Sequence, residues 1–378
     1  MFDDLKIIIK ETKEYMLELL SIVSTTVSCS LSIHSNIKYI EKFFKTRYLC
    51  YDLSKLKSFY VDTELIEKNT PYEELHNFIE RPIEKVVFHK KSGDFHLYDD
   101  NIPEIKSFQS AALSEFKSNG KMIFDSKTIR LEKFEVKKTS IHMTVAKCKY
   151  SDQVQTHLVL DWKNKHLKEL EMISYRGYLA AKYKKKLPPL DTPFLSNSIG
   201  ISVILYFKKD NYLVPYLPLR NKSILNKTKN EPALYEGVFT TSSSGVLEWS
   251  ERELSMDYIK NEMYREIHEE LGLEKNDIDL LECIALVRDL LRAGKPQIFF
   301  AGYINLTEEQ LVEKRNKAIV KNQNDISAKV EIKNKHLPFS ELKNGFRSPV
   351  FSFELAGNLY YSEKFFKSTN GIKILENI

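Results

Sequence analysis

The sequence predicts two domains that each combine helices and strands: an α+β domain over residues 1–190 and a second domain over residues 196–378. A chain of 378 residues exceeds the usual size of one hydrophobic core. Three prolines and a run of three lysines interrupt every periodic pattern over residues 184–193, which places the boundary there. Helical and strand periodicity both occur on each side of that boundary.

In the N-terminal domain, helices are expected first and strands later. The predicted elements are helices within residues 1–80, a β-hairpin over 86–100, strands over 129–138, 140–150 and 156–162, and a helix over 167–184. The hairpin is expected to turn at Ser92, Gly93 and Asp94. No motif in this half assigns it a function, so dimerisation, substrate selection and regulation stay open as its roles.

The C-terminal domain opens with two apolar segments around a short polar turn, which predicts an antiparallel hairpin over residues 199–219. A helix is predicted over residues 255–271, because apolar residues repeat every four positions from Ile259 to Leu271 and form one buried stripe. Gly272 is placed to end this helix. The elements expected after it are a buried strand over 298–304 and an exposed, charged helix and loop over 307–329.

The composition is that of an ordinary globular protein, with 42% hydrophobic and 29% charged residues. The net charge of +5 is small for this length, and the lysines are spread along the chain. Such a balance suits a polyanionic small molecule as well as RNA, since both present phosphates. The composition is therefore compatible with a phosphorylated partner and does not choose its kind.

Cysteine usage favours a reducing, cytoplasmic location. Cys29, Cys50, Cys148 and Cys283 lie far apart and form no CxxC pair, which argues against a zinc site or a disulfide framework. The first residues contain acids where a secretory signal has basic residues. The least polar stretch, residues 22–33, is rich in Ser and Thr and shorter than the about 20 residues that a bilayer requires, so no membrane span is expected.

Three acids crowd one side of the predicted helix. Glu266, Glu269 and Glu270 stand at i, i+3 and i+4, so their carboxylates are neighbours and repel each other. A divalent cation relieves that repulsion, and hard oxygen ligands suit Mg²⁺ or Mn²⁺. Arg265 is placed to hold one of the carboxylates in a fixed orientation. The alternative is that the acids form the solvated face of an ordinary helix.

Residues 265–273, REIHEELGL, match every fixed position of the pattern REUxEExGU, in which U is a bulky aliphatic residue. This pattern is the second half of the Nudix signature, and Gly245 followed by Glu251 supplies the first half behind a Ser-rich turn. The C-terminal half therefore resembles the Nudix hydrolase family. Thirteen residues separate Glu251 from Arg265, six more than the family's usual seven, and Asp257 stands at the seven-residue spacing and competes with Glu251.

The resemblance implies an α/β/α sandwich with a mixed sheet over residues 196–378. It also implies metal-dependent hydrolysis of a diphosphate linkage in a nucleoside diphosphate derivative, such as a nucleotide sugar or an ADP-ribose-like compound. The implied catalytic residues are Arg265, Glu266, Glu269, Glu270 and Glu331, and the implied residues around Mg²⁺ (or Mn²⁺) are Gly245, Glu251, Glu266, Glu269 and Glu270. Glu331 is the candidate for a further ligand or general base from a later loop, with Glu308, Glu309 and Glu313 as competitors.

Four basic residues are candidates for substrate binding. Arg220 ends the second strand of the predicted hairpin, and Arg288, Arg292 and Lys295 gather near a Gly-Lys-Pro turn ahead of the buried strand. A cluster of this kind can clamp phosphates, and it can equally be a set of solvated loop charges. The specific substrate stays open.

Two other functions remain open. A Nudix fold without activity serves as a nucleotide sensor, and the lengthened spacer is compatible with that function, although three clustered acids are not needed for sensing. A hydrolase of capped or triphosphorylated RNA is supported only by the lysines of residues 182–186 and the tyrosines interleaved near them, which a charged linker explains equally well. The expected partner is therefore a phosphorylated small molecule, with nucleic acid less favoured, no membrane, and a homodimer left open.

Overall fold

The computed structural model describes residues 56, 59–60, 72–118, 125–162, 174–209, 212–220, 239–321, 332–334, 352–368 and 371. The chain divides into two compact units, Met1–Tyr48 and Leu49–Ile378, and every described residue belongs to the second unit. The helices predicted within residues 1–80 therefore lie largely outside the described residues, and the prediction is wrong at residues 72–77, which form a strand. In the part of the chain that is described, no helix has the length and apolar character needed to cross a membrane.

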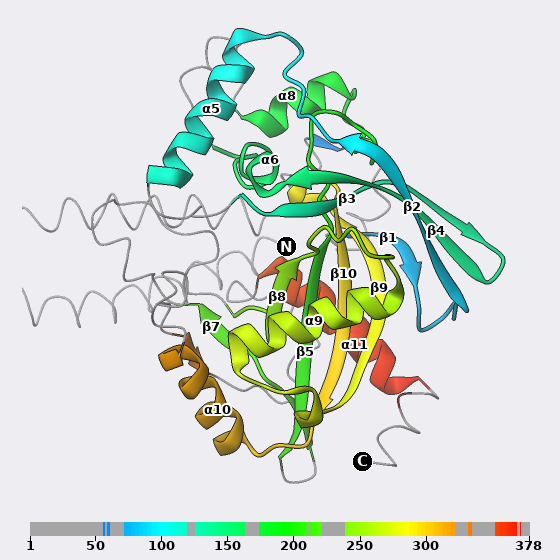
Figure 1. Cartoon of the computed structure of the whole chain (residues 1–378), viewed down its shortest axis with the longest axis vertical. Helices are drawn as coiled ribbons and strands as arrows, with labels where there is room; N and C mark the ends of the chain where they lie inside the picture. The colour runs from blue at the N-terminus through cyan, green and yellow to red at the C-terminus, as the bar shows by residue number, and fades with distance from the viewer. Residues whose placement is uncertain are drawn as a thin grey trace, which may run out of the picture. The chain divides into compact units, whose positions relative to one another are not determined.

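A mixed sheet forms the centre of this unit (Figure 1). Its strands are β1 (Tyr72–Asn77), β9 (Ile278–Asp289), β10 (Lys295–Ile304), β5 (Gly200–Lys209) and β6 (Tyr212–Pro215), in that order, with β8 (Ser243–Val246) also paired to β5. β10 and β5 are parallel, and the other pairs are antiparallel. The predicted opening hairpin is confirmed as β5 and β6, and the predicted buried strand is confirmed within β10.

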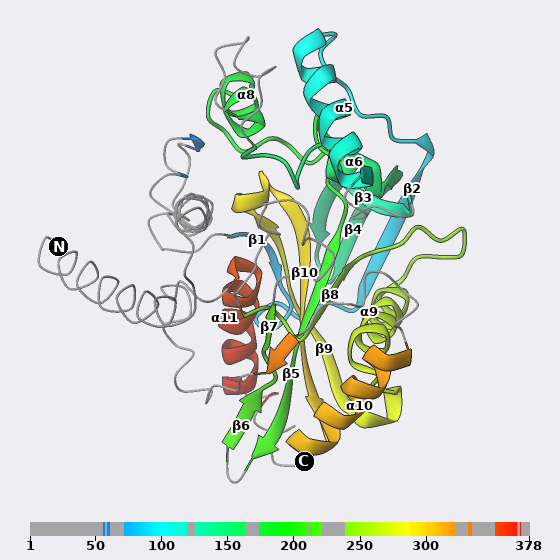
Figure 2. The ribbon, with the colours of Figure 1, turned by 90° about the vertical axis from the view of Figure 1, so that its left-hand side faces the viewer.

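Helices cover both faces of the central sheet (Figure 2). α9 (Met256–Leu271) buries its apolar stripe against one face of β5, which includes Ile201 and Val203. α11 (Phe353–Lys367) packs on the opposite face, which includes Ile204 and Tyr206. Alternate residues of β5 thus point to opposite helices, as the two-residue period of a strand requires. The C-terminal part has the expected helix–sheet–helix layering around a mixed sheet.

The sheet also takes in a strand from the N-terminal side of the predicted boundary. β1 runs antiparallel to β9, with Tyr72 opposite Asp289 and Asn77 opposite Ala285. The ring of Tyr72 lies so close to α11 that a Cβ atom added at Gly357 would approach its Cε2 atom to 2.4 Å. Packing of this kind ties β1 to the same core as α11.

A second, three-stranded sheet has the order β2-β4-β3, with β2 at Lys85–Asp94, β4 at Ser140–Lys149 and β3 at Lys127–Lys137. The hairpin predicted over residues 86–100 is wrong, because β2 runs straight through its expected turn and pairs in parallel with β4. Gly93 has a φ of +86°, and the register shifts between Lys90 and Asp94. The glycine thus produces an irregularity within one strand instead of a reversal of the chain.

The remaining elements lie around these two sheets. They are α5 (Pro103–Ser118), α6 (Tyr150–Val154), α8 (Tyr175–Lys182), η2 (Lys275–Asp277), η3 (Leu290–Arg292), α10 (Glu308–Lys321), and the strand pair β7 (Pro218–Arg220) and β11 (Ile332–Asn334). α5 and α8 share a core that includes Phe108 and Tyr175, whose rings stack 5.6 Å apart. The predicted strand over 156–162 is wrong, because these residues form turns after α6.

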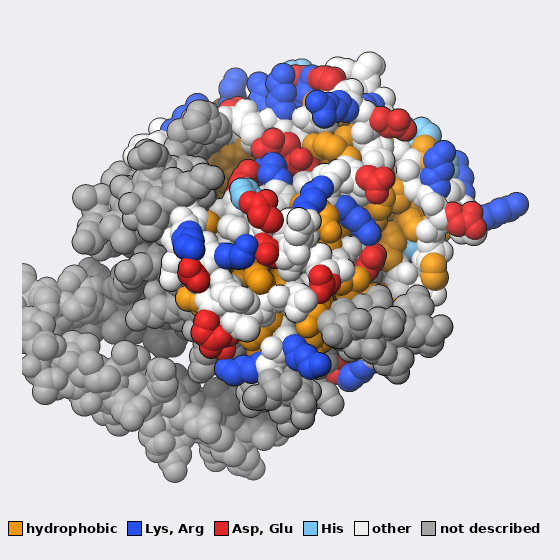
Figure 3. All heavy atoms as spheres, turned by 60° about the horizontal axis from the view of Figure 1, so that its bottom comes forward, with side chains coloured by type: hydrophobic (Ala, Val, Ile, Leu, Met, Phe, Trp, Pro, Cys, Tyr) orange, Lys and Arg blue, Asp and Glu red, His pale blue; other side chains and the backbone are white. Residues whose placement is uncertain are grey.

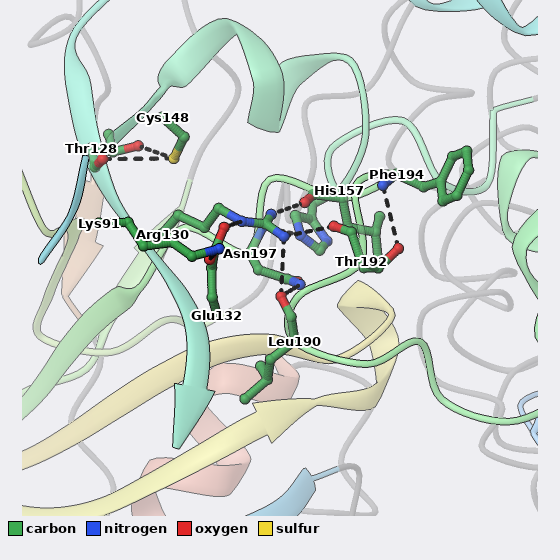
Figure 4. A network of polar contacts seen from close by, with 11 residues as sticks. Lys91, Thr128, Arg130, Glu132, Cys148, His157, Leu190, Thr192, Phe194 and Asn197 are labelled. Carbon is green, nitrogen blue, oxygen red and sulfur yellow. Dashed lines mark hydrogen bonds and ion pairs between the residues drawn. The ribbon is translucent and has the colours of Figure 1, made fainter. Parts of the chain in front are cut away.

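The proline-rich segment at the predicted boundary is fixed by one buried side chain (Figure 4). The guanidinium group of Arg130, on β3, donates hydrogen bonds to the carbonyl oxygens of Leu190 (3.2 Å), Thr192 (2.6 Å) and Leu195. Its Nε atom lies 3.2 Å from Glu132 Oε1, and the residue is completely buried. The segment therefore supplies carbonyl groups to a buried charge and is part of the packed structure.

Candidate active site

The acidic side chains are carried by α9, and the sequence explains why this helix begins and ends where it does. The hydroxyl of Ser255 accepts a hydrogen bond from the Tyr258 amide at 3.1 Å, which satisfies one of the free donors of the first turn. Gly272 adopts a φ of 69° at the other end, a conformation that favours glycine. Because the apolar stripe faces the sheet, Glu269 and Glu270 are exposed.

Arg265 lies among the carboxylates of this helix. Its Nη2 atom is 2.8 Å from Glu266 Oε1, and its Nη1 atom is 2.9 Å from Glu269 Oε1. Nη2 is also 3.1 Å from Glu262 Oε2 and 3.8 Å from Glu248 Oε1. One guanidinium group therefore supplies positive charge to several acids and orients Glu266 and Glu269 through its fork of donors.

Strand β8 brings backbone atoms against the same carboxylates. A Cβ atom built on Gly245 would lie 2.2 Å from both Cδ and Oε1 of Glu266, so only glycine leaves room for this side chain. The backbone amide of the preceding residue, Ser244, donates a hydrogen bond of 3.1 Å to Glu270 Oε2. The glycine of the first half of the signature thus has a direct physical role: it admits the Glu266 carboxylate to the surface of β8.

The buried position of Glu266 makes its carboxyl group a weaker acid than usual. Burial raises the pKa of Glu266 to about 8, the positive charge of Arg265 opposes that rise, and the negative charges of Glu270 and Glu269 add to it. The Glu266 side chain is only 13% exposed. A further positive charge beside this carboxyl group would stabilise its ionised form and lower its pKa.

The carboxylates around Arg265 are candidates to hold a divalent metal ion. Within the described residues, no three His, Cys, Asp or Glu side chains lie close enough together in this structure to hold a metal ion. The donors themselves are carboxylates, the ligands that Mg²⁺ and Mn²⁺ prefer. Burial and the negative charges of Glu270 and Glu269 raise the pKa of Glu266, and a cation beside these carboxylates would offset both effects. The donor chemistry and the crowded negative charge therefore fit a hard divalent cation.

Glu251, the acid of the first half of the signature, is turned toward other partners. Its Oε1 atom accepts a hydrogen bond of 3.1 Å from the indole nitrogen of Trp249 and lies 3.9 Å from Lys147 Nζ. The Glu251 side chain is 81% exposed. Its competitor Asp257 is exposed in the first turn of α9. The assignment of Glu251 to the metal stays a prediction.

Two of the basic residues predicted to clamp phosphates, Arg288 and Lys295, are buried around β9 and β10, and Arg292 is half-buried. Arg288 is 3.0 Å from Glu73 Oε2 and donates to the carbonyl oxygens of Gly294 (3.2 Å) and Pro188. Arg292 donates to the carbonyl oxygen of His157 at 3.3 Å. Burial lowers the pKa of Lys295 to about 8, and the negative charge of Glu354 opposes that shift. These contacts are within the protein, so the phosphate role of the three residues stays a prediction.

The remaining candidates are known only in part. Arg220 is the last residue of β7 and pairs with Ile332 of β11, while its side chain lies outside the described atoms. Glu331 lies outside the described residues. On α10, Glu308 is paired with Lys209 at 2.7 Å, and Glu313 is paired with Lys317 at 2.6 Å.

Two partners of Arg265 were not expected from the sequence. Glu262 stands three residues before Arg265 on the same helix, so helical spacing alone could have indicated it. Glu248 approaches Arg265 from the segment between β8 and α9, and no local pattern could have indicated that contact.

The surface seen in Figure 3 gives no sign of a broad field of one charge. Lys and Arg side chains are interspersed with Asp and Glu side chains, and apolar side chains lie between them. An extended basic surface of the kind that tracks a nucleic acid backbone is not seen on this face.

A comparison of the sequence with protein-family models finds no match, and neither does a comparison with curated proteins. Among solved structures, the chain is similar to a mutT/Nudix family protein from Listeria innocua, with 21% sequence identity and a TM-score of 0.29 over 48% of this chain and 95% of that chain. It is also similar to an Ap4A hydrolase from C. elegans, with 13% identity and a TM-score of 0.25 over 45% of this chain and 97% of that chain.

Proposed function

We propose that this protein is a Nudix-type hydrolase that uses a divalent metal ion to cleave a diphosphate linkage in a nucleoside diphosphate derivative. The observation that carries the proposal is that the Glu266 carboxylate contacts Arg265 and fills the space that a side chain at position 245 would occupy. Both halves of the signature meet at this one carboxylate. The ordinary alternative, a solvated acidic helix face, does not explain why Glu266 is buried at the only position of β8 that could admit it.

Glu266, Glu269 and Glu270 are the residues that would hold Mg²⁺ or Mn²⁺, beside the backbone at Gly245. The metal would neutralise charge that develops on the phosphate oxygens and lower the pKa of a bound water. Arg265 holds Glu266 and Glu269 in fixed directions before the cation arrives. Burial raises the pKa of Glu266, and a cation beside it would favour the deprotonated carboxylate.

Two further roles are proposed for residues near the strand pair β7 and β11. Glu331 is the proposed general base or further ligand, and Arg220 is a proposed contact to the substrate. Their support is the register in which Arg220 lies opposite Ile332, the residue that follows Glu331.

The proposed partner is a phosphorylated small molecule, and the proposed location is the cytoplasm. Support for the location comes from Cys148 and Cys283, whose thiols are free and buried. The N-terminal half is proposed to select the substrate or to regulate the site, since its strand β1 pairs with the central sheet and its strand β3 contacts the segment that leads into α9.

The test is a screen of the purified protein with Mg²⁺ or Mn²⁺. The substrates are ADP-ribose, NAD, nucleotide sugars, dinucleoside polyphosphates, nucleoside triphosphates and capped RNA. The Glu270→Gln variant is run beside the wild type, with Glu80→Gln as a matched control, because Glu80 is 56% exposed and paired with Lys364. Metal-dependent cleavage that is lost in Glu270→Gln and kept in Glu80→Gln is expected.

Two other outcomes would redirect the proposal. Cleavage of capped RNA alone would favour an RNA hydrolase. Tight binding of a nucleotide with no cleavage of any substrate would contradict the hydrolase and favour a sensor.

A further inference from the structure

The segment between β8 and α9, residues 247–255, contains the end of the first half of the signature and the start of the lengthened spacer, and it is paired with the second sheet. The amide of Ile129 donates a hydrogen bond of 2.9 Å to the carbonyl oxygen of Leu247. The amide of Trp249 donates one of 2.9 Å to the carbonyl oxygen of Lys127, and Thr128 forms an antiparallel bridge with Glu248. The segment therefore extends the edge of β3 before the chain turns into α9.

A lysine from the far strand of that sheet holds the next part of the segment. Lys90, on β2, donates hydrogen bonds from its ammonium group to the carbonyl oxygens of Ser250 (2.8 Å) and Arg252 (2.6 Å). The same ammonium group lies 5.2 Å from the centre of the Trp249 ring, within the range of a cation–π interaction. Lys147 lies 5.8 Å from the same ring. Two cations from the second sheet therefore lie beside the Trp249 ring.

The held segment also contacts the acidic helix. The hydroxyl of Tyr258, in the first turn of α9, donates a hydrogen bond of 2.7 Å to the carbonyl oxygen of Glu248. The carboxylate of Glu248 lies 3.8 Å from Arg265 Nη2. One residue of the segment therefore touches β3, the start of α9 and the guanidinium group that orients Glu266.

We propose that Lys90 is a positioning residue: by holding residues 248–252 it sets the position of Arg265 relative to Glu266 and Glu269. The proposal rests on the proposed function, because the activity it affects is the hydrolysis assigned to those carboxylates. The lengthened spacer begins at Arg252, so the hydrogen bond from Lys90 to the carbonyl oxygen of Arg252 holds the start of that spacer. A longer connection has more conformations and orders its ends less well, and this contact restricts it at one end.

The test uses the full chain in a Trp162→Phe background, which leaves Trp249 as the single tryptophan. Lys90→Met keeps most of the length of the side chain and removes its donors, and Lys90→Arg keeps the positive charge and restores donors. Lys133→Met is the matched control, since Lys133 belongs to the same sheet, is 64% exposed and pairs with Glu135. The readouts are acrylamide quenching of Trp249, kcat and KM with the substrate found in the screen, and Mn²⁺ binding measured by water proton relaxation.

In Lys90→Met we expect stronger quenching of Trp249, weaker Mn²⁺ binding and a kcat lowered about tenfold, with KM nearly unchanged, because a small misplacement of catalytic groups affects turnover first. Lys90→Arg is expected to restore most of the loss, and Lys133→Met is expected to match the parent protein. If quenching and kcat in Lys90→Met equal those of Lys133→Met, Lys90 does not position the site. A parent protein without turnover contradicts the proposed function instead. In that case equal quenching and Mn²⁺ binding in Lys90→Met and Lys133→Met would still overturn the positioning role.

Discussion

Gly245 and Glu266 share a space that holds only one of two things: the Glu266 carboxylate or a side chain at position 245. A Cβ atom at that position would lie 2.2 Å from Oε1 of Glu266 and 2.8 Å from its Cγ. Contacts below 3.0 Å do not occur between real atoms of this kind, so one of the two groups would have to move. The two halves of the signature are therefore joined by one steric relationship, although twenty residues separate Gly245 from Glu266 in the sequence.

Replacing Gly245 by alanine is expected to abolish most of the activity. The added methyl group would push the Glu266 carboxylate away from β8, and a displacement of about 1 Å lowers turnover on the order of 100-fold. Steady-state kinetics with saturating Mg²⁺ measure the effect. Gly177→Ala is the control, because the nearest atom to a Cβ there is 3.8 Å away. If turnover in Gly245→Ala is within twofold of that in the control, Glu266 does not belong to the active site.

Replacing Arg265 by lysine is expected to lower kcat about tenfold or more, although the charge is kept. The guanidinium fork contacts Glu266 and Glu269 through different nitrogen atoms, and a single ammonium group cannot reproduce that geometry. Affinity for Mn²⁺ and kcat are measured together. A loss of affinity without a loss of kcat at saturating metal would mean that Arg265 supplies only charge.

The sequence predicts α9 well because the signals are local. The apolar stripe and Gly272 lie within or beside the helix, and both are found as expected. The relative positions of Arg265, Glu266 and Glu269 follow from helical spacing in the same way. Local signals of this kind need no knowledge of the rest of the fold.

Features that depend on distant contacts could not be predicted. β1 pairs with a strand that lies 200 residues later in the chain, and nothing in its own sequence indicates that partner. The hairpin expected at Gly93 is wrong because parallel pairing with β4 stabilises a straight strand. The direction of Glu251 depends on Trp249 and on Lys147 from the second sheet, so the signature alone could not fix it.

The pKa of Lys295 leads to a prediction about stability and pH. Its pKa is lowered to about 8 by burial, against 10.5 in its ordinary state. Between these values the unfolded chain binds more protons than the folded one, so the penalty for the buried charge is complete below pH 8 and is relieved as the pH rises to 10.5. Lys295→Met is expected to raise the free energy of unfolding at pH 7 by roughly 2 kcal/mol, and to lose this advantage near pH 10.5.

Urea unfolding of both proteins at several pH values measures this difference. Lys367→Met is the control, since Lys367 is 57% exposed and pairs with Glu363 on the same helix. The same Lys295→Met protein also tests the phosphate clamp, because loss of a contact to the substrate raises KM. A stability gain that does not depend on pH would contradict the lowered pKa of Lys295.

Arg130 leads to the last prediction, which concerns the proline-rich segment. Arg130→Met would remove the donors to the buried carbonyl oxygens of Thr192 and Leu195 and one of two donors to that of Leu190, which also accepts a hydrogen bond of 2.8 Å from the Asn197 side chain. Buried carbonyl groups left without donors destabilise a fold, so the free energy of unfolding is expected to fall by about 3 kcal/mol. The free energy of unfolding of Arg130→Lys is expected to lie between those of Arg130→Met and the wild type, because one ammonium group reaches fewer of these oxygens than the guanidinium fork. The segment has the composition of a flexible linker, and a linker would lose almost nothing from either change. Urea unfolding of the two variants beside Lys133→Met therefore decides whether residues 184–195 behave as a linker or as part of the packed structure.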